Sequence, residues 1–529
     1  MRWRALGVLL LAGCAGTGGG PAAIGVPLPV GSLRPEDRVV LGDFSRVQAI
    51  AAAAEVVYVA YPSAVGVWRP YLGRWEVPRS APGRMALGEV FSAVVDPLDR
   101  SLWLAARQGI VHFDPLIDRW DQHPLPGPLT ALGLDPTDPA GGVWVRSASG
   151  WYRQPRIGAA TPGIPPARLQ LAPTLEDAYR EIPALRGLGA TLALGPGLDP
   201  GRLTAAAPSA SGDGWYVGTS QRGTYFVDHS GLRTTPLSLG LRGETVGALA
   251  SVPGGVWVAT DDDFGGHPAS LAFVPDDLAR TVHLEGDPAF GLGIDAARRI
   301  VPGDRVLWLA SNLGVVSVEI DGQRIRRWNE TDGLVDQRVL SLVPWRGGMM
   351  AGTMRGIAFI GADGEVERPL PGMVRPVYAL FAHRDTLWIG TGRGLLAHVA
   401  GSPEPVGMPA FDRALGANAP VLGIGTVGGT LMVMTTTVLL WRDPVQAEWR
   451  TAPILTATTG PLRAFHATRH GAWVGGDRGA AFVRADGAVL HTLRVGVELP
   501  AEVTAIGGDD RWLWVGTLRG LVRLALVGG

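Results

Sequence analysis

The sequence predicts an all-β protein of about eleven four-stranded repeats, and two observations lead to that fold class. The 529 residues contain 75 glycines and 42 prolines, yet 46% of the chain is apolar. This combination is typical of many short strands joined by tight turns. In addition, almost the same ten residues occur twice, as LWIGTGRGLL from Leu387 and as LWVGTLRGLV from Leu513. Their tryptophans, Trp388 and Trp514, lie 126 positions apart, which is three times 42.

The same order of strand, glycine turn and strand recurs along most of the chain. Eleven segments carry it, and the position that corresponds to Trp388 falls at residues 58, 103, 144, 216, 257, 308, 350, 388, 432, 473 and 514. Nine of the ten spacings lie between 38 and 51 residues. A repeat of about 42 residues made of apolar strands and glycine turns predicts a β-propeller, in which each repeat forms one four-stranded blade.

The number of repeats bears on how the blades are grouped. Eleven blades exceed the four to eight that usually form one ring. We therefore expect two rings of five to six blades, a first propeller over residues 44–280 and a second over residues 281–529. One large ring, or one ring inserted in another, is the alternative. The last repeat ends at Val527 without an outer strand, and residues 38–41 are the candidate for a ring-closing strand.

One spacing is much longer than the others. The 72 residues between Trp144 and Tyr216 contain an insertion over about residues 155–213. Within it, Thr174 is followed three residues later by Asp177, which is typical of a helix start with a capping side chain. A degenerate twelfth blade is the other interpretation of this insertion.

The N-terminus has the features of an export signal. Arg2 and Arg4 precede the apolar run Leu6–Ala12, which is too short to cross a bilayer as a helix. The run leads to Cys14, the single cysteine of the chain, which excludes a disulfide framework and a thiolate metal site. This segment resembles the signal peptide of a bacterial lipoprotein.

That resemblance implies that residues 1–13 are removed and that lipid is attached to the thiol of Cys14. Residues 14–43 then form a tether that ends in the candidate ring-closing strand, and their small, uncharged beginning suits that role. Ala15 follows the cysteine where lipoproteins kept in the inner membrane often carry Asp. The resemblance therefore favours the outer membrane, with the protein facing the periplasm or the cell surface.

A second recurring pattern is most complete in IRRWNETDGLVDQRVLSLV, residues 325–343. Together with WIGTGRGLL from Trp388, it resembles the two-component regulator propeller repeat, and the resemblance covers nearly the whole chain after the signal peptide. That family occurs in extracytoplasmic sensor regions of hybrid histidine kinases and in other envelope proteins. The resemblance implies a β-propeller outside the cytoplasm, with a sensing or recognition role.

The arginine before the turn glycine is the sharpest candidate for chemistry. It occurs in five repeats, as Arg222, Arg355, Arg393, Arg478 and Arg519. By resemblance to other propellers, this turn joins the second and third strands on the face where ligands usually bind. Several guanidinium groups around one rim would suit the binding of carboxylates or sulfates. The structural alternative is that each arginine pairs with an Asp or a carbonyl of the neighbouring blade.

Other candidate residues give weaker signals. Residues 261–263 are three aspartates that offer oxygen ligands for calcium, but no EF-hand spacing surrounds them, so a solvated acidic loop is favoured. No metal site is expected from the histidines at 112, 123, 466 and 470, since no helix or acidic partner brings them together. Most tryptophans follow the repeat and belong to blade cores. The candidates for an exposed aromatic rim are those outside it, Trp151, Trp345 and Trp512.

Charge and motifs limit the classes of function. With 47 basic and 48 acidic residues, the chain has no net field that would recruit nucleic acid. No catalytic motif and no phosphate-binding glycine loop stands in a credible context, so we expect neither an enzyme nor a cofactor. The sequence therefore predicts a lipid-anchored envelope β-propeller that binds an extracytoplasmic ligand, such as an anionic glycan or peptide. A scaffold that binds other envelope proteins is the alternative, and a propeller lyase or hydrolase is less favoured.

Overall fold

The computed structural model describes residues 38–526 apart from 79–86, 108, 126, 188–201, 262–268, 285–291, 293, 323, 416–418, 444–447 and 454. The predicted signal peptide, Cys14 and most of the predicted tether lie outside the described residues. The described chain forms eleven antiparallel sheets, ten with four strands and one with five, as expected for propeller blades. In this part of the chain no helix is long and apolar enough to cross a membrane.

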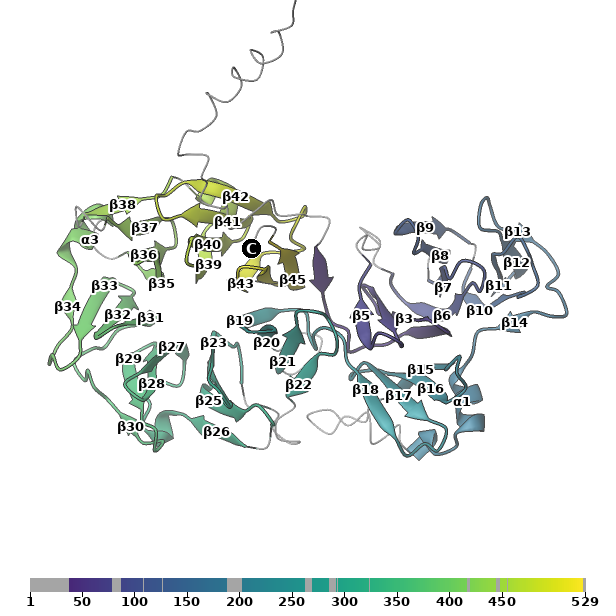
Figure 1. The fold of residues 1–529 in the computed structure, drawn as a ribbon, viewed down its shortest axis with the longest axis horizontal. Coiled ribbons are helices and arrows are strands. Elements are labelled where there is room, and N and C mark those ends of the chain that lie inside the picture. Colours follow the sequence, from purple (N-terminus) through teal and green to yellow (C-terminus); the bar gives the residue numbers. More distant parts are fainter. Residues whose placement is uncertain are drawn as a thin grey trace, which may run out of the picture.

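Seven of the sheets form a closed ring, which occupies the left of Figure 1. The innermost strands of the ring, in order, are β19 (Val246–Val252), β23 (Arg299–Pro302), β27 (Val339–Trp345), β31 (Val377–His383), β35 (Val421–Val427), β39 (Leu462–Ala467) and β43 (Val503–Gly508). Each contacts the next, and β43 contacts β19 again. We call this assembly the seven-sheet ring.

The remaining strands of the seven-sheet ring lie outside these inner strands in each blade. They are β20 (Gly255–Thr260), β21 (Ser270–Pro275), β22 (Val282–Leu284), β24 (Val306–Ser311), β25 (Gly314–Glu319), β26 (Ile325–Trp328), β28 (Gly348–Thr353), β29 (Gly356–Ile360), β30 (Val366–Glu367), β32 (Thr386–Thr391), β33 (Gly394–Val399), β34 (Val406–Gly407), β36 (Thr430–Thr435), β37 (Leu439–Arg442), β38 (Trp449–Thr451), β40 (Gly471–Gly476), β41 (Gly479–Arg484), β42 (Val489–Arg494), β44 (Trp512–Thr517), β45 (Gly520–Ala525) and β1 (Val39–Leu41).

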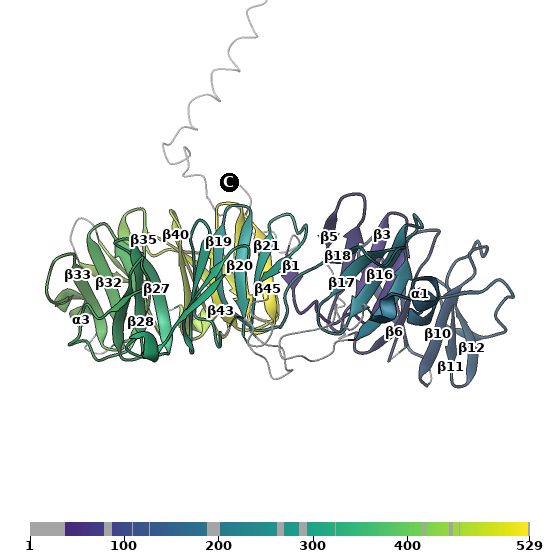
Figure 2. The same ribbon diagram turned by 90° about the horizontal axis from the view of Figure 1, so that it is seen from below.

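The other four sheets form a second unit, which lies beside the seven-sheet ring in both views (Figures 1 and 2). Its strands are β2 (Ala49–Ala53), β3 (Val56–Ala60), β4 (Val65–Arg69), β5 (Arg74–Glu76), β6 (Val90–Val95), β7 (Leu102–Ala106), β8 (Gly109–Asp114), β9 (Arg119–His123), β10 (Leu129–Leu134), β11 (Val143–Ser147), β12 (Gly150–Gln154), β13 (Thr161–Pro162), β14 (Gln170–Leu171), β15 (Leu203–Pro208), β16 (Gly214–Thr219), β17 (Thr224–Asp228) and β18 (Thr234–Leu237). Its inner strands contact one another in the order β15, β2, β6, β10. We call it the four-sheet unit.

The insertion between Trp144 and Tyr216 contributes a helix and two short strands. The helix α1 (Leu175–Glu181) begins as predicted, because the Thr174 side chain accepts from the backbone N–H of Asp177 and the Asp177 carboxylate accepts from that of Thr174. The strands β13 and β14 extend the sheet of β10 to β12 at its two edges. The described part of the insertion thus adds to an existing blade instead of forming a twelfth. Further helical segments in the described chain include η3 (Glu330–Asp332), α3 (Pro409–Leu415) and α4 (Thr456–Thr459).

The seven-sheet ring is closed by a strand from the beginning of the chain. In β1, Val39 pairs with Arg523 and Leu41 with Leu521 of β45, so the last sheet receives its outer strand from residues 39–41. Leu41 is fully buried. This is the strand that the sequence suggested at residues 38–41.

The chain leaves the ring after β1, builds the four-sheet unit and returns at β19. The outgoing and returning segments are hydrogen-bonded to each other: Phe44 N–H donates to the Leu241 carbonyl at 3.1 Å, and Leu241 N–H donates to that of Gly42 at 3.1 Å. One continuous core also joins the two assemblies, since Phe44 belongs to the same cluster as Val246 and Trp514.

The blade grouping differs from the expected five and six. The first three strands of the β19 to β22 sheet lie before residue 281, yet β19 contacts both β23 and β43, so this sheet belongs with the six that follow. The long spacing before Trp308 comes from long connections within the ring, between β20 and β21 and between β22 and β23. The passage between the two assemblies instead falls in the short segment between β18 and β19.

The repeated TxRG sequence builds the same turn in several blades. In the last blade, the buried Thr517 hydroxyl donates to the Gly520 carbonyl at 2.8 Å and accepts from the Arg519 N–H at 3.1 Å. Gly520 has a φ of +100°, a backbone conformation that residues with a Cβ atom rarely adopt. Equivalent bonds occur at Thr353 and Thr391. The wording recurs because each β-hairpin needs a hydroxyl and a glycine at these positions.

Candidate functional site

A cavity of about 140 Å³ lies in the middle of the seven-sheet ring. Every one of the seven inner strands contributes to its wall, which makes it the central channel of the ring. Most of the wall is apolar or small. The polar residues that line it are Arg298, Arg299, Ser341, Tyr378, Arg463 and Thr504.

The polar residues gather toward one end of the channel. Arg299 is the first residue of β23, and Tyr378, Arg463 and Thr504 are each the second residue of their inner strand. Because the inner strands of a propeller run in the same direction, their first residues lie at the same end of the channel. We call this end the arginine mouth.

Arg299 is the channel arginine whose pKa is shifted by its surroundings. Its side chain is solvent-exposed in the channel, and the protein atoms around the guanidinium disfavour its charged form, which lowers the pKa of Arg299. Among the described residues no carboxylate pairs with it. An arginine stays protonated at neutral pH even so. The channel therefore holds a positive charge that no carboxylate among the described residues compensates, and this charge attracts anions.

The other two arginines of the channel wall, Arg463 and Arg298, lie near carboxylates. Arg463 forms an ion pair with Asp477, with 2.9 Å between Nη1 and Oδ1, and a longer one with Glu502 at 3.8 Å. Arg298 lies close enough to Asp261 for its charge to counteract the rise in the pKa of that carboxyl group caused by burial. The Asp261 carboxylate accepts the Ala297 N–H at 2.8 Å. Arg299 is thus the channel arginine whose charge remains available.

Two neutral groups at the arginine mouth add hydrogen-bonding capacity. The buried Thr504 hydroxyl has no hydrogen-bond partner within the described structure. Tyr378 lines the same space. The cavity wall contains no carboxylate and no histidine among the described residues. A guanidinium with nearby hydroxyls can bind the oxygens of an anion, whereas this wall offers no paired groups for general acid–base chemistry.

The five predicted turn arginines do not all surround one channel. Arg355, Arg393, Arg478 and Arg519 lie in the seven-sheet ring, between the second and third strands of their blades, and Arg222 lies in the four-sheet unit. The second-to-third turns of a blade lie at the end where its inner strand begins. The four ring arginines therefore share the end of the ring that carries the arginine mouth.

Arg355 is engaged by the protein itself. Its Nε contacts Asp336 Oδ2 at 3.1 Å, and its Nη2 contacts Glu330 Oε1 at 3.4 Å and the Val335 carbonyl at 3.3 Å. It also borders a surface pocket of about 410 Å³. That pocket is larger than the channel cavity, and Glu330 and Arg368 also line it. The Arg368 guanidinium donates to the Gly333 and Leu334 carbonyls at 3.3 and 3.4 Å.

The other ring arginines are exposed. Arg393 and Arg519 donate their backbone N–H to a threonine hydroxyl of the turn, and Arg478 donates its own to the Thr459 carbonyl. Within the described residues their guanidinium groups form no ion pair. They add positive charge around the arginine mouth without forming a pocket of their own.

The channel arginines were missed in the sequence because they are not repeated. Arg298 and Arg299 precede IVP, and Arg463 stands in PLRAF, just before or within an inner strand. Aligning the residues that begin each inner strand would have placed them together. The repeated turn arginines were visible because they occur in five repeats.

The remaining sequence candidates take structural positions. The described residues contain no group of three or more potential metal ligands, and residues 262 and 263 lie outside them. Trp345 is only 8% exposed, so the expectation of an exposed rim is wrong for it. The Trp512 ring is half-buried, with the Arg523 guanidinium 4.2 Å from its centre. Trp151 is also half-buried, on β12.

His466 is expected to make the stability of the protein depend on pH. Burial and then the charge of Arg299 lower the pKa of His466 from 6.5 to about 4, despite the hydrogen bond at 3.2 Å from its Nε2 to the Gly508 carbonyl. Between pH 6.5 and 4 the unfolded chain therefore binds a proton that the folded chain does not. We expect this histidine to remove roughly 2 to 3 kcal/mol of stability as the pH falls through that range.

Urea unfolding at pH 7 and pH 4.5 measures this effect. The His466→Gln variant keeps an N–H donor without a titrating ring, so its loss of stability between the two pH values should be smaller than that of the parent. Equal losses would contradict the prediction.

No family model matches the chain, and no curated protein matches it. Similar solved structures include the extracellular domain of a putative one component system from B. thetaiotaomicron, at 11% identity and a TM-score of 0.42, over 91% of this chain and 70% of that one. PorZ, a bacterial surface component of the type-IX secretion system of Porphyromonas gingivalis, is similar at 11% identity and a TM-score of 0.45, over 91% and 69%. A streptogramin B lyase is similar at 14% identity and a TM-score of 0.44, over 55% and 96%.

Proposed function

We propose that the protein is a recognition module that binds an anionic ligand at the arginine mouth of the seven-sheet ring. The observation that carries the proposal is Arg299, a guanidinium in the channel wall with no carboxylate partner among the described residues. A cavity of about 140 Å³ accommodates a carboxylate, sulfate or phosphate group. The rest of a larger ligand, such as an acidic glycan or peptide, would extend over the exposed arginines at the same end of the ring.

The proposal includes the location expected from the sequence. Lipid at Cys14 would hold the protein to a membrane of the envelope, and the ring would recognise its ligand outside the cytoplasm. A sensing role would require a separate partner to carry the signal onward. What supports binding over catalysis is the channel wall, which supplies cations and hydroxyls where a hydrolase would need acids or an activated nucleophile.

Calorimetric titration of the purified full-length chain tests this function. The ligands are sulfate, phosphate, hexuronate oligomers and acidic peptides, each with a neutral counterpart, at low and high salt. We expect the acidic ligands to bind, their neutral counterparts to fail, and the affinity to fall with salt. Equal binding of acidic and neutral ligands, or no binding in the panel, would argue against an anion-recognition module.

A further inference from the structure

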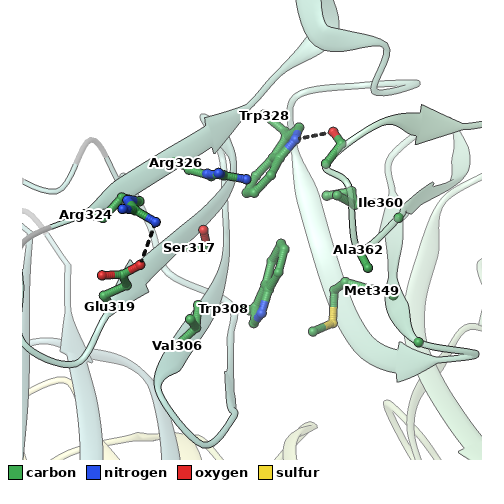
Figure 3. A pocket seen from close by; sticks show the side chains of 14 residues that line it. Val306, Trp308, Ser317, Glu319, Arg324, Arg326, Trp328, Met349, Ile360 and Ala362 are labelled. Atoms are coloured by element: carbon green, nitrogen blue, oxygen red, sulfur yellow. Dashed lines mark hydrogen bonds and ion pairs between the residues drawn. The ribbon is translucent and has the colours of Figure 1, made fainter.

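A second pocket, of about 360 Å³, lies between two neighbouring blades of the seven-sheet ring. One wall is the sheet of β23 to β26, with Trp308, Ser317 and Arg326, and the other is the sheet of β27 to β30, with Met349 and Ile360 (Figure 3). The pocket is bordered by turns that join the first strand of a sheet to the second, and the third strand to the fourth. It therefore opens at the end of the ring opposite the arginine mouth.

The other blades show why space exists here. In three sheets the aromatic residue of the second strand is covered by a phenylalanine of the third. These pairs are Tyr216 with Phe226, Trp257 with Phe273 and Trp473 with Phe482, with ring centres 5.2 to 5.3 Å apart. At the equivalent register Trp308 faces Ser317. The volume that a phenyl ring fills in those sheets is here part of the pocket.

One other blade pairs an aromatic residue with a small one. Trp388 faces Ala397, but Trp388 packs against a cluster that includes Phe411 and Val433. The half-buried Trp308 also packs against a core cluster, which includes Met349 and Ile360, and in addition it borders the pocket. Its other ring contact is with Trp328, at 5.1 Å and an interplanar angle of 19°. The Trp328 indole N–H donates to the Gly364 carbonyl at 2.9 Å, which fixes this ring as a rigid support (Figure 3).

Polar groups stand beside the half-buried indole of Trp308. Trp308, Ser317 and Arg326 occupy one row across β24, β25 and β26, so their side chains leave the same face of the sheet. Arg326 is exposed, and within the described structure it has neither a hydrogen bond nor an ion pair. Arg324 differs, since it pairs with Glu319 at 3.3 Å. The pocket thus combines an aromatic platform, a hydroxyl, a carboxylate and an available guanidinium.

We propose that this pocket binds a pyranose ring that bears a carboxylate, that is, a hexuronic acid residue. The apolar face of the sugar would stack on Trp308 in the place that phenylalanine takes in other blades, and its carboxylate would meet Arg326. The sugar hydroxyls would bond with Ser317 and Glu319. A plain aromatic ligand would leave these polar groups unsatisfied. The site is separate from the arginine mouth and does not depend on it.

The experiment uses glucuronate and galacturonate with the purified full-length chain, followed by tryptophan fluorescence and by saturation-transfer NMR. Ser317→Phe restores the phenylalanine of the other blades, and we expect it to abolish uronate binding while keeping or raising the melting temperature. Trp308→Ala should weaken binding about tenfold or more. Arg326→Gln should remove the preference for uronates over neutral hexoses. Arg327→Gln, on the opposite face of β26, is the matched control and should bind like the parent.

The outcomes separate the two sites. Uronate binding that survives in Arg299→Gln and disappears in Ser317→Phe supports this pocket, whatever happens at the arginine mouth. Binding lost in Arg299→Gln and kept in Ser317→Phe would assign the sugar acid to the channel and overturn the proposal. Absence of uronate binding, or tighter binding of benzoate than of either uronate, would overturn it as well.

Discussion

Removal of residues 1–41 is expected to open the seven-sheet ring and to lower its melting temperature by roughly 5 to 15 °C. The truncation deletes β1, and with it the pairing along β45 and the fully buried Leu41 side chain. Val39 and Val40 also pack against the two clusters on either side of this sheet. Burial of three such side chains contributes about 3 to 6 kcal/mol, before the exposed edge of β45 is counted.

A truncation that ends at residue 37 is the control for this prediction, because it removes the same predicted export segment and most of the predicted tether but leaves β1 in place. Scanning calorimetry of the two truncated chains gives the comparison. Leu41→Ala in the full chain should cost about 2 to 5 kcal/mol by itself. Identical melting temperatures for the two truncations would mean that the ring does not need its N-terminal strand.

Replacing Arg299 by glutamine should weaken the binding of an acidic ligand about 10- to 100-fold, since a charge-assisted hydrogen bond is worth about 1.5 to 3 kcal/mol. The same change removes a solvent-exposed charge that has no carboxylate partner in the described structure. The melting temperature of Arg299→Gln should therefore stay the same or rise. Loss of binding together with unchanged or higher stability distinguishes a ligand-binding arginine from a structural one.

Arg519→Gln provides the matched comparison, because Arg519 lies at the same end of the ring but outside the channel wall. Its affinity should change less than twofold to threefold, and mainly at low salt. Titration calorimetry and thermal unfolding of both variants test the pair. If Arg519→Gln loses the ligand and Arg299→Gln retains it, the exposed turn arginines form the site instead.

The blades could be predicted from the sequence, and their grouping could not. The repeated LWxGTxRGL wording specifies a β-hairpin, its buried threonine and its glycine turn, so the fold follows from local signals. Which inner strands meet depends on contacts between residues far apart, such as β19 with β43. The spacing between repeats depends on the lengths of the loops that connect the strands. A long loop within one ring gives the same spacing as a loop that connects two rings, so the spacing cannot show where one ring ends.

The candidate site was hidden for a related reason. Repeated residues are easy to find in a sequence, but most of them are repeated because every blade needs them for folding. Arg355 is an example, because it lies in a repeated turn and pairs with Asp336. The channel and the pocket are formed where single blades depart from the pattern, at Arg299 and at Ser317. These two residues can be recognised as exceptions only when the blades are superimposed. That superposition requires the pairing register of the strands, which the sequence does not provide.

The N-terminal closing strand also determines when the ring can form. Leu41 and its partner Leu521 lie 480 positions apart in the chain, so a ribosome has made nearly everything else before the two can meet. The four-sheet unit is continuous in sequence and can fold while synthesis proceeds, whereas β1 has no partner strand until β45 has been made. Bringing such distant segments together is entropically costly, and we expect ring closure to be the slow step of refolding.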